Sequence, residues 1–199
     1  MEVTIRPLTT DLIPAYLEFF DNRAFSETDV NGPCYCTCPT QTSEEIDQMV
    51  SESGGDIKGT LRRYAEKMLH EGKITGYLAF HDHDDVVIGW CNAGDMNGYV
   101  KNRYQFIPDF ARDIAVGKTM SIVCFAIAPE YRGKGVSTAL LERVVSDAAE
   151  QGYAAVEGYA YVKSGEEFDF KGPARLYEKS GFSAAAEQNG VVVMRRSLL

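Results

Sequence analysis

The sequence predicts an α/β (α+β) fold, in which short strands alternate with amphipathic helices along a chain of 199 residues. The apolar run from Ile122 to Ala128 has the length and the β-branched and aromatic content of a buried central strand. Apolar residues then recur at helical spacing from Val136 to Gln151, and Gly152 is a natural helix stop. A glycine-rich turn joins this strand to this helix, and such a turn at a helix N-terminus is typical of a phosphate site.

The N-terminal part is expected to begin with a strand and to continue with helices. The strand is Val3 to Pro7, and Asp11 is expected to cap an apolar-periodic helix that ends at about Phe20. Residues 22–41 lose this periodicity. Two further helices are predicted on either side of the break Ser53-Gly54-Gly55, namely Ser43 to Ser51 and Ile57 to His70.

Strands dominate the expected order after this point. The sequence predicts strands at Thr75 to His81 and Val86 to Ala93, with the polar residues 81–85 as a hairpin tip. Residues 94–118 are a long connection between adjacent strands, which makes a binding role plausible. The remaining expected elements are a strand at Val156 to Val162, a helix around Tyr177 and a closing hairpin at Asn189-Gly190.

The turn after the central strand reads Arg132-Gly133-Lys134-Gly135-Val136-Ser137. Its two glycines allow backbone torsions and close approaches that side chains forbid. Free amides, the positive end of the helix dipole and the cations Arg132 and Lys134 together favour a pyrophosphate or a similar anion. Neither Gly-x-x-x-x-Gly-Lys-Ser/Thr nor Gly-x-Gly-x-x-Gly occurs here, so nucleotide hydrolysis and dinucleotide binding are unsupported.

Two motifs, in this order, resemble those of the Gcn5-related N-acetyltransferase (GNAT) superfamily. Residues 132–137 resemble its Arg/Gln-x-x-Gly-x-Gly/Ala signature. Residues 174–182, Ala-Arg-Leu-Tyr-Glu-Lys-Ser-Gly-Phe, look like its Ala-x-x-Leu-Tyr-x-x-x-Gly-Phe segment. A strand-like stretch separates the two motifs, and the resemblance covers residues 119–182.

Several positions depart from the superfamily pattern. Ser137 stands where the turn usually ends in Gly or Ala, and Phe170 and Pro173 replace an asparagine and an alanine upstream of Tyr177. One cofactor contact is therefore expected to be missing or replaced. Ser121 aligns with the glutamate base of histone-acetylating members, so no carboxylate is available at that position.

The resemblance implies a mixed, mostly antiparallel sheet flanked by helices and splayed between the strands that begin near Met120 and Val156. Acetyl-coenzyme A would bind in this splay. The backbone of Phe125, Ala126 and Ile127 would hydrogen-bond its pantetheine arm. Its pyrophosphate would be held by the amides of the turn, namely Arg132, Gly133, Lys134, Gly135, Val136 and Ser137. The thioester would end beside Tyr177.

Acetyl transfer to an amine needs both a base and an acid. A lysine-like amine of pKa about 10.4 loses its proton at pH 7 at a cost of roughly 4.6 kcal/mol. Tyr177 is the candidate acid, because a phenol of pKa about 10 can donate once attack on the thioester has begun, although a core tyrosine would show the same pattern. Strand amides could polarise the carbonyl. The base has three candidates: Glu157, Asp95 and a water held by Ser121 or a backbone carbonyl.

The cysteines suggest reduced thiols rather than a disulfide framework. They number five, which is odd, and Cys34, Cys36 and Cys38 alternate, so an extended segment would place these three thiols on one face. Their spacing is unlike that of structural zinc sites, and no metal is expected. A substrate-lining role, an oxidation-sensitive role and simple packing all stay open. Cys91 and Cys124 are expected core thiols, and His81 and His83 fit a solvated hairpin tip better than a metal site.

Composition favours a single catalytic domain over residues 1–199, because no Pro/Ser/Gly-rich linker divides the chain. No signal-peptide pattern and no membrane-length apolar run occur, so a soluble cytoplasmic protein is expected. The net charge of −9 argues against nucleic acid and anionic membranes as partners and suits a cationic amine.

The expected activity is that of an N-acetyltransferase that moves acetyl from acetyl-coenzyme A directly to a primary amine, preferably of a small molecule. One alternative is a non-catalytic coenzyme A-binding sensor of the same fold. Another is a transferase with a cysteine nucleophile from residues 34–38. A homodimer is compatible with the resemblance, and the apolar strand Val191 to Met194 could pair across its interface or complete the sheet.

Overall fold

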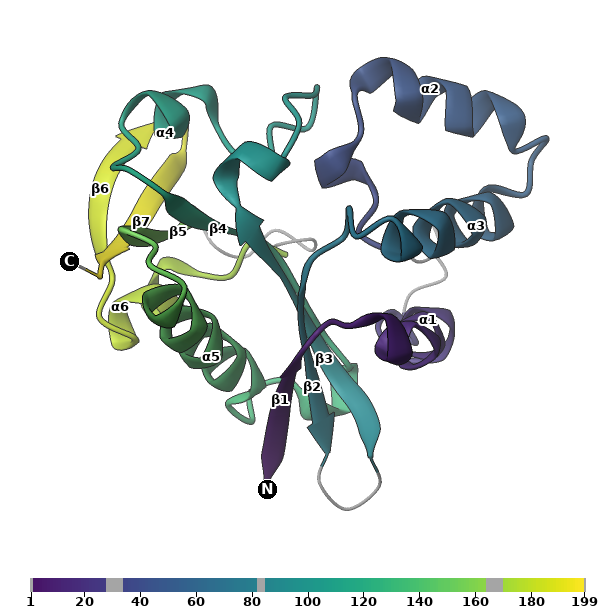
Figure 1. The fold of residues 1–199 in the computed structure, drawn as a ribbon, viewed down its shortest axis with the longest axis horizontal. Helices are drawn as coiled ribbons and strands as arrows, with labels where there is room; N and C mark the ends of the chain where they lie inside the picture. The colour runs from purple at the N-terminus through teal and green to yellow at the C-terminus, as the bar shows by residue number, and fades with distance from the viewer. Residues whose placement is uncertain (1, 28–33, 82–84, 164–169, 199) are drawn as a thin grey trace.

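The computed structural model describes residues 2–27, 34–81, 85–163 and 170–198 (Figure 1). Within these residues, seven strands form one sheet in the order β1-β2-β3-β4-β5-β7-β6. Neighbouring strands are antiparallel except for β4 and β5, which are parallel. The mixed, mostly antiparallel sheet is therefore confirmed.

Each expected strand is present, with ends that match the prediction for Val3–Pro7 and differ by a few residues for the others. The strands are β1 Val3–Pro7, β2 Gly76–His81, β3 Val86–Asp95, β4 Thr119–Ile127, β5 Ala155–Tyr161, β6 Ser183–Gln188 and β7 Val191–Ser197. Asn189 and Gly190 have φ angles of 52° and 79°, as a tight β6–β7 hairpin requires. Strand β7 lies between β5 and β6 of the same chain, so it completes the sheet. The predicted tip between β2 and β3 falls largely on residues 82–84, outside the described residues.

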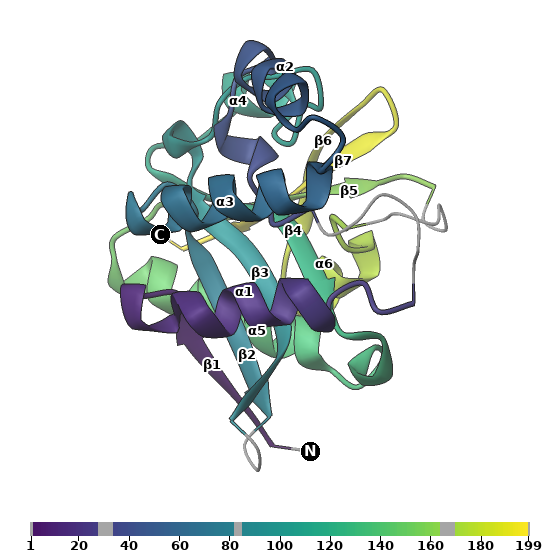
Figure 2. The same cartoon turned by 90° about the vertical axis from the view of Figure 1, so that its right-hand side faces the viewer.

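Helices cover both faces of the sheet (Figures 1 and 2). They are α1 Ile13–Asn22, α2 Ser43–Glu52, α3 Ile57–His70, α4 Asp109–Asp113, α5 Val136–Glu150 and α6 Ala174–Lys179. Figure 2 shows α1 and α3 across one face, whereas Figure 1 shows α5 on the other. Gly152, with φ 71°, follows α5 as the predicted stop.

The predicted helix cap at Asp11 is wrong. Residues Thr10–Leu12 form a short 3-10 turn, and α1 begins after it, with Leu12 at the cap position and Pro14 in the first turn. A hydrogen bond from the Thr9 side chain lowers the pKa of Asp11 instead. The helix signal placed the element correctly, but the proline moved its start beyond Asp11.

The core has one layer on each face of the sheet. Between the sheet and the α1/α3 pair, Tyr16 packs edge-on against Trp90 with ring centres 4.9 Å apart. On the other face, α5 packs on the central strands. Its residues Leu140 and Val144 share one apolar cluster with Ile88 of β3, Ile122 of β4 and Val156 of β5. The side chains of each central strand therefore alternate between two buried layers, which is why these strands read as continuous apolar runs.

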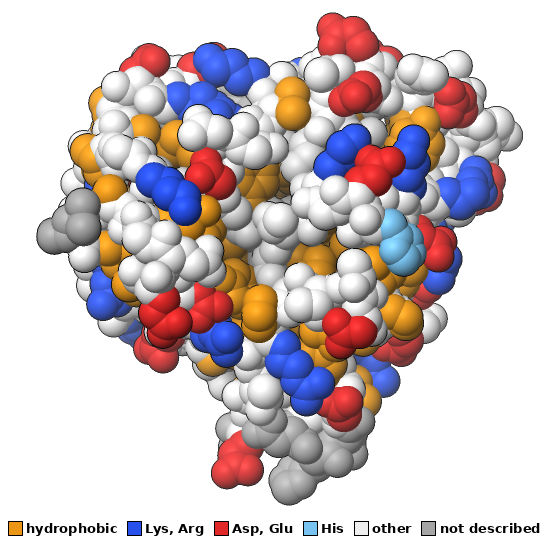
Figure 3. All heavy atoms as spheres, in the orientation of Figure 1, with side chains coloured by type: hydrophobic (Ala, Val, Ile, Leu, Met, Phe, Trp, Pro, Cys, Tyr) orange, Lys and Arg blue, Asp and Glu red, His pale blue; other side chains and the backbone are white. Residues whose placement is uncertain are grey.

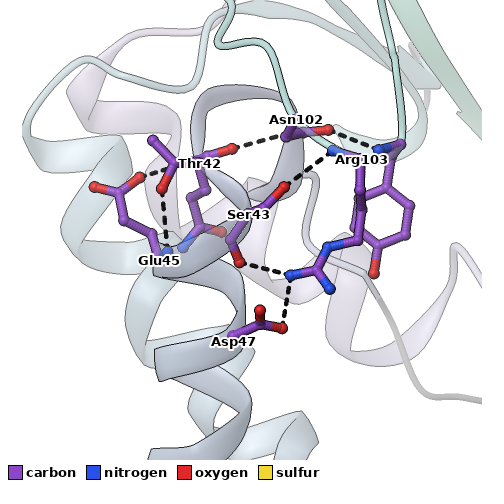
Figure 4. A network of polar contacts seen from close by, with 8 residues as sticks. Thr42, Ser43, Glu45, Asp47, Asn102 and Arg103 are labelled. Carbon is purple, nitrogen blue, oxygen red and sulfur yellow. Dashed lines mark hydrogen bonds and ion pairs between the residues drawn. The ribbon is translucent and has the colours of Figure 1, made fainter.

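A polar network joins the segment at the start of α2 to the long connection 94–118, for which the sequence suggested a binding role (Figure 4). Asn102 donates from Nδ2 to the carbonyls of Cys38 (2.7 Å) and Gln41 (2.9 Å). Arg103 donates to the Ser43 carbonyl and binds Asp47, both at 2.6 Å. Hydrogen bonds and an ion pair therefore hold the start of α2 and the loop before it against the connection between β3 and β4.

The surface carries both signs of charge. Figure 3 shows Lys and Arg side chains interspersed with Asp and Glu over one face, with hydrophobic side chains recessed between them. In the described part of the chain, no helix has the length and apolar character needed to cross a membrane.

Candidate active site

The predicted phosphate turn lies where β4 ends and α5 begins. Gly133 and Gly135 have φ angles of 72° and 87°, which favour glycine, and α5 starts directly after Gly135. Apart from chain neighbours, no described atom lies within 4 Å of the place where either glycine would carry a Cβ. The Gly135 carbonyl accepts the first hydrogen bond of the helix, from Ala139 at 3.0 Å. The amides of residues 136–138 therefore lack acceptors inside the helix and are available to an anion.

The two cations of the turn lie at its rim. Arg132 donates to the Ile127 carbonyl (3.2 Å) and pairs with Glu27 (3.0 Å). Lys134 Nζ lies 5.5 Å from the centre of the Tyr131 ring. The Arg132 and Glu27 side chains are 54% and 60% exposed, so their pairing contributes little in water and can open in favour of a phosphate.

The sheet opens between β4 and β5. The last pair between the two strands is Ile122 with Gly158, although β4 continues to Ile127 and β5 to Tyr161. Beyond this pair the facing edges of both strands have no partner strand in the described sheet. The splay implied by the family resemblance is therefore present.

A β-bulge explains where the splay begins. On the other edge of β4, Asn92 pairs with Cys124 and Ala93 pairs with Ile122, which leaves Val123 as an extra residue. Bulges bend and twist the strand that contains them. The bulge follows directly after the last β4–β5 pair, so β4 leaves β5 at Val123.

The open edge of β4 presents alternate peptide groups to the splay. Phe125 donates its amide to the carbonyl of Phe170 at 2.6 Å. Because peptide groups alternate along a strand, Ile127 faces the same side, whereas Ala126 faces β3, where it pairs with Trp90. A pantetheine arm along this edge would meet the peptide groups of Phe125 and Ile127. At Phe125 it would have to displace the Phe170 carbonyl.

Tyr177 lies at the root of the splay. Its ring is fully buried, with centres 6.4 Å from Phe125 and 5.4 Å from Phe182. It lies directly over Gly158, where an added Cβ would come within 2.5 Å of the phenol oxygen. The hydroxyl donates to the Lys171 carbonyl at 2.6 Å. To protonate a leaving thiolate, Tyr177 must exchange this acceptor.

A buried polar network holds Glu157 on β5. The Arg195 guanidinium donates to Glu157 at 2.6 Å and to the Ile114 carbonyl at 2.7 Å. Tyr159 links this pair to Ser121, with 3.5 Å between Tyr159 Oη and the Glu157 carboxylate and 2.7 Å between Tyr159 Oη and Ser121 Oγ. Burial raises the pKa of Glu157, and the hydrogen bond and charge of Arg195 oppose that rise. Glu157 therefore holds a proton more readily than an exposed glutamate.

Glu157 and Tyr177 lie on opposite faces of the sheet. Glu157 and Gly158 are consecutive in β5, so Glu157 points to the α1/α3 face while Tyr177 covers Gly158 on the α5 face. A group bound in the splay would have a carboxylate on one side and a phenol on the other.

Asp95 is placed less well to act as a base. Alternation along β3 puts it on the same face as Cys91 and Ala93, which pack on the α5 side. Its carboxylate accepts a hydrogen bond from the Asn97 amide at 2.9 Å and so caps a short 3-10 turn.

The prediction that Cys34, Cys36 and Cys38 share one face is wrong. Tyr35 and Cys36 have φ angles of 45° and 51°, so the segment is turned rather than extended, and Cys36 is buried while Cys34 is exposed. A hydrogen bond with Cys36 raises the pKa of Cys34, a hydrogen bond with Cys124 raises that of Cys36, and burial raises that of Cys38. These thiols are therefore poor nucleophiles near neutral pH. The described residues contain no group of three or more potential metal ligands.

The sequence-based prediction missed two residues of this site and the role of a third. Tyr159 could have been found, because it lies two positions after Glu157 on the same face of one strand. Arg195 lies 38 residues away from Glu157 in sequence, and no local signal marks it. The sequence also contains no signal that the Phe170 carbonyl accepts a hydrogen bond from Phe125, because this contact depends on the path of a loop.

Comparison with known proteins agrees with this geometry. A family model described as the acetyltransferase (GNAT) family matches residues 43–182, well over half of the chain. A search of curated proteins found no matching sequence.

Solved structures share the fold at low sequence identity. An acetyltransferase assigned to the GNAT family from Desulfovibrio desulfuricans is 18% identical, with a TM-score of 0.55 and full coverage of both chains. The PaiA N-acetyltransferase from Thermoplasma acidophilum, solved with coenzyme A, is 15% identical, with a TM-score of 0.53 and 99% coverage of both chains. YncA from Salmonella typhimurium, solved with acetyl-CoA, is 17% identical, with a TM-score of 0.52, covering 100% of this chain and 95% of its own.

Proposed function

The chain belongs to the acetyltransferase (GNAT) family, and we propose that it transfers acetyl from acetyl-coenzyme A directly to a primary amine of a small molecule. The observation that carries this proposal is the splay of β4 from β5 at Val123, next to the open amides of the turn after β4. Together they provide a line of peptide groups, from the open edge of β4 to the turn, that could bind the pantetheine arm and the pyrophosphate.

The residues present fit coenzyme A. The turn offers the amides of residues 136–138 beside the open space at Gly133 and Gly135, and Arg132 and Lys134 add positive charge at its rim. Phe125 and Ile127 offer peptide groups at the spacing of a strand, which suits the amides of a pantetheine arm. Acetyl-coenzyme A, when bound, supplies the activated acetyl group.

Glu157 and Tyr177 are the proposed acid–base pair. Glu157 would take the amine proton through the hydroxyls of Tyr159 and Ser121, which are linked at 2.7 Å. Its raised pKa brings a carboxylate closer to the basicity that this task needs. Tyr177, on the other face, would release the Lys171 carbonyl and give its proton to the thiolate.

Two alternatives make different predictions. A coenzyme A-binding sensor is supported by Ser121 in place of a glutamate and by Phe170 in place of an asparagine. A cysteine nucleophile is disfavoured by the raised thiol pKa values of residues 34–38.

The test is coenzyme A release from acetyl-coenzyme A over a panel of amines, with calorimetry of cofactor binding in parallel. We expect turnover on at least one amine class, lowered at least tenfold in Tyr177→Phe and Glu157→Gln, with unchanged cofactor affinity. Cofactor binding without turnover on any amine would favour the sensor. An isolable acetyl-cysteine adduct would favour a covalent mechanism.

A further inference from the structure

A cavity of about 360 Å³ lies beside the splay, and its lining contains neither Glu157 nor Tyr177. Its walls come from four parts of the chain: the loop after β3 with Tyr104, helix α4 with Phe110, the end of β5 with Tyr161, and the β6–β7 turn. Lys171 also lines it. Its volume lies within the range of ordinary small-molecule sites.

The Phe170-Lys171 segment borders both this cavity and the splay. The carbonyl of Phe170 binds the Phe125 amide, and the carbonyl of Lys171 binds the Tyr177 hydroxyl. The Lys171 side chain is 3% exposed and extends the other way, toward the cavity. One short stretch of backbone therefore touches both the proposed reaction centre and the cavity.

The cavity lies on the face of the sheet that carries the proposed base. Tyr161 follows Glu157 and Tyr159 at alternate positions of β5, so all three side chains point to the same side. An amine that occupies the cavity with its body would reach toward Glu157 along β5, while the cofactor groove lies along β4.

Three aromatic residues, Tyr104, Phe110 and Tyr161, line the cavity. Tyr104 is 55% exposed, the only aromatic residue among the large exposed hydrophobic residues of the described chain. Its ring centre is 6.0 Å from that of Phe106, which is 6.1 Å from that of Phe170. Phe106 and Phe170 do not line the cavity themselves, but these rings connect the exposed Tyr104 to the residue whose carbonyl binds the Phe125 amide at the splay. Exposed rings in contact with a cavity are typical of ligand sites.

The charge of the cavity suits an uncharged body with one ammonium group. Its charged side chains, Asp109 and Lys171, are of opposite sign, and Asp109 already pairs with Lys101 at 2.7 Å. The Lys171 ammonium lies 4.9 Å from the centre of the Tyr161 ring, so this ring already packs against a cation. Nothing in these walls favours a polyanionic acceptor.

We propose that this cavity binds the body of the acceptor, and that the acceptor is a primary amine carried by an aromatic ring. Tyr104, Phe110 and Tyr161 are its specificity residues, through ring–ring contacts. This inference rests on the proposed acetyl transfer and names the substrate class of the same site.

The test compares amines that differ in aromaticity but hardly in size. The value of kcat/KM with acetyl-coenzyme A is measured for 2-phenylethylamine, 2-cyclohexylethylamine and butylamine. We expect the phenyl compound to exceed the cyclohexyl compound at least fivefold in the wild type. This preference should disappear in Tyr104→Leu and Phe110→Leu and persist in the control Tyr64→Leu, whose tyrosine lies on α3 away from the cavity. Equal values for the two ring compounds, or a preference that survives both cavity variants, would overturn the aromatic site while leaving acetyl transfer standing.

A binding readout separates this proposal from the proposed function. Saturation-transfer NMR of 2-phenylethylamine with the coenzyme A-loaded protein needs no turnover. If no amine reacts but the ring signal appears in the wild type and is lost in both cavity variants, the aromatic site stands and acetyl transfer to such amines fails. If no ring signal appears and no aromatic amine reacts, the aromatic site is overturned.

Discussion

The contact between Gly158 and Tyr177 yields the sharpest prediction, because a single methyl group perturbs the root of the splay. An alanine Cβ at position 158 would lie 2.5 Å from the phenol oxygen of Tyr177 and closer still to two ring carbons. Ordinary contacts between such atoms are about 3.5 Å. The Tyr177 ring must therefore move by roughly 1 Å out of its place between Phe125 and Phe182, which holds it on both sides.

Two energies add up in Gly158→Ala. Overpacking a well-filled core costs about 1–3 kcal/mol. Movement of the ring also breaks the hydrogen bond from Tyr177 to the Lys171 carbonyl, and leaving a buried acceptor unsatisfied costs about 1–3 kcal/mol. We expect a loss of about 3 kcal/mol in the free energy of unfolding. For a chain of this size, that corresponds to a decrease in Tm of roughly 6–12 °C.

A double-mutant cycle identifies the cause. Tyr177→Leu removes the outer ring atoms, so Gly158→Ala should be nearly neutral in that background, with a coupling free energy of about 3 kcal/mol between the two positions. Thermal unfolding of the four proteins measures it. The control Gly98→Ala places a methyl group in open space and should leave Tm unchanged. The reasoning is refuted if Gly158→Ala lowers Tm equally with and without the Tyr177 ring.

Three further predictions address the turn, a helix cap and the buried carboxylate. Gly135→Ala places a side chain at φ 87°, so it should cost about 1–2 kcal/mol of stability and weaken coenzyme A binding by calorimetry, whereas Gly98→Ala should do neither. Thr42→Ala breaks the capping box with Glu45 (3.2 and 2.7 Å), so urea unfolding should reveal a loss of about 1 kcal/mol with no change in coenzyme A affinity. Burial raises the pKa of Glu157, so the folded chain keeps this proton to higher pH than the unfolded chain. The stability contributed by Glu157 is therefore present at low pH and is lost as the pH rises through its folded pKa. In a plot of Tm against pH, Glu157→Gln should reduce this fall in Tm with rising pH, whereas the control Glu187→Gln, at an exposed position, should not. Identical plots for Glu157→Gln and the wild type would contradict a raised pKa of Glu157.

Local patterns predicted the elements well. The strand Val3–Pro7 and the helix Ile57–His70 have the predicted ends. The glycines of the turn after β4 adopt positive φ, and so do Gly152 and the Asn189-Gly190 hairpin. Each of these features depends on side-chain periodicity or on the backbone torsions that one or two residues permit. A short stretch of sequence is enough to determine either property.

The predictions for Asp11 and for Cys34, Cys36 and Cys38 were wrong because neighbouring residues gave the backbone a different conformation from the one that each prediction assumed. Asp11 is a good cap residue, but Pro14 and a 3-10 turn moved the start of α1 past it. The alternation of Cys34, Cys36 and Cys38 has meaning only in an extended segment, and the positive φ angles of Tyr35 and Cys36 turn the chain instead.

The sequence by itself determined the order of elements, the glycine turn at the start of α5 and the family to which these motifs point. Only the tertiary structure decided that β4 bulges at Val123 beside the last β4–β5 pair, that Arg195 of β7 holds Glu157 of β5, and that Phe170 occupies the edge of the splay. The physical reason is that torsional preference and periodicity act over a few residues. Strand neighbours, bulges and buried ion pairs instead depend on which distant segments meet across the sheet, and that is settled by the packing of the whole chain.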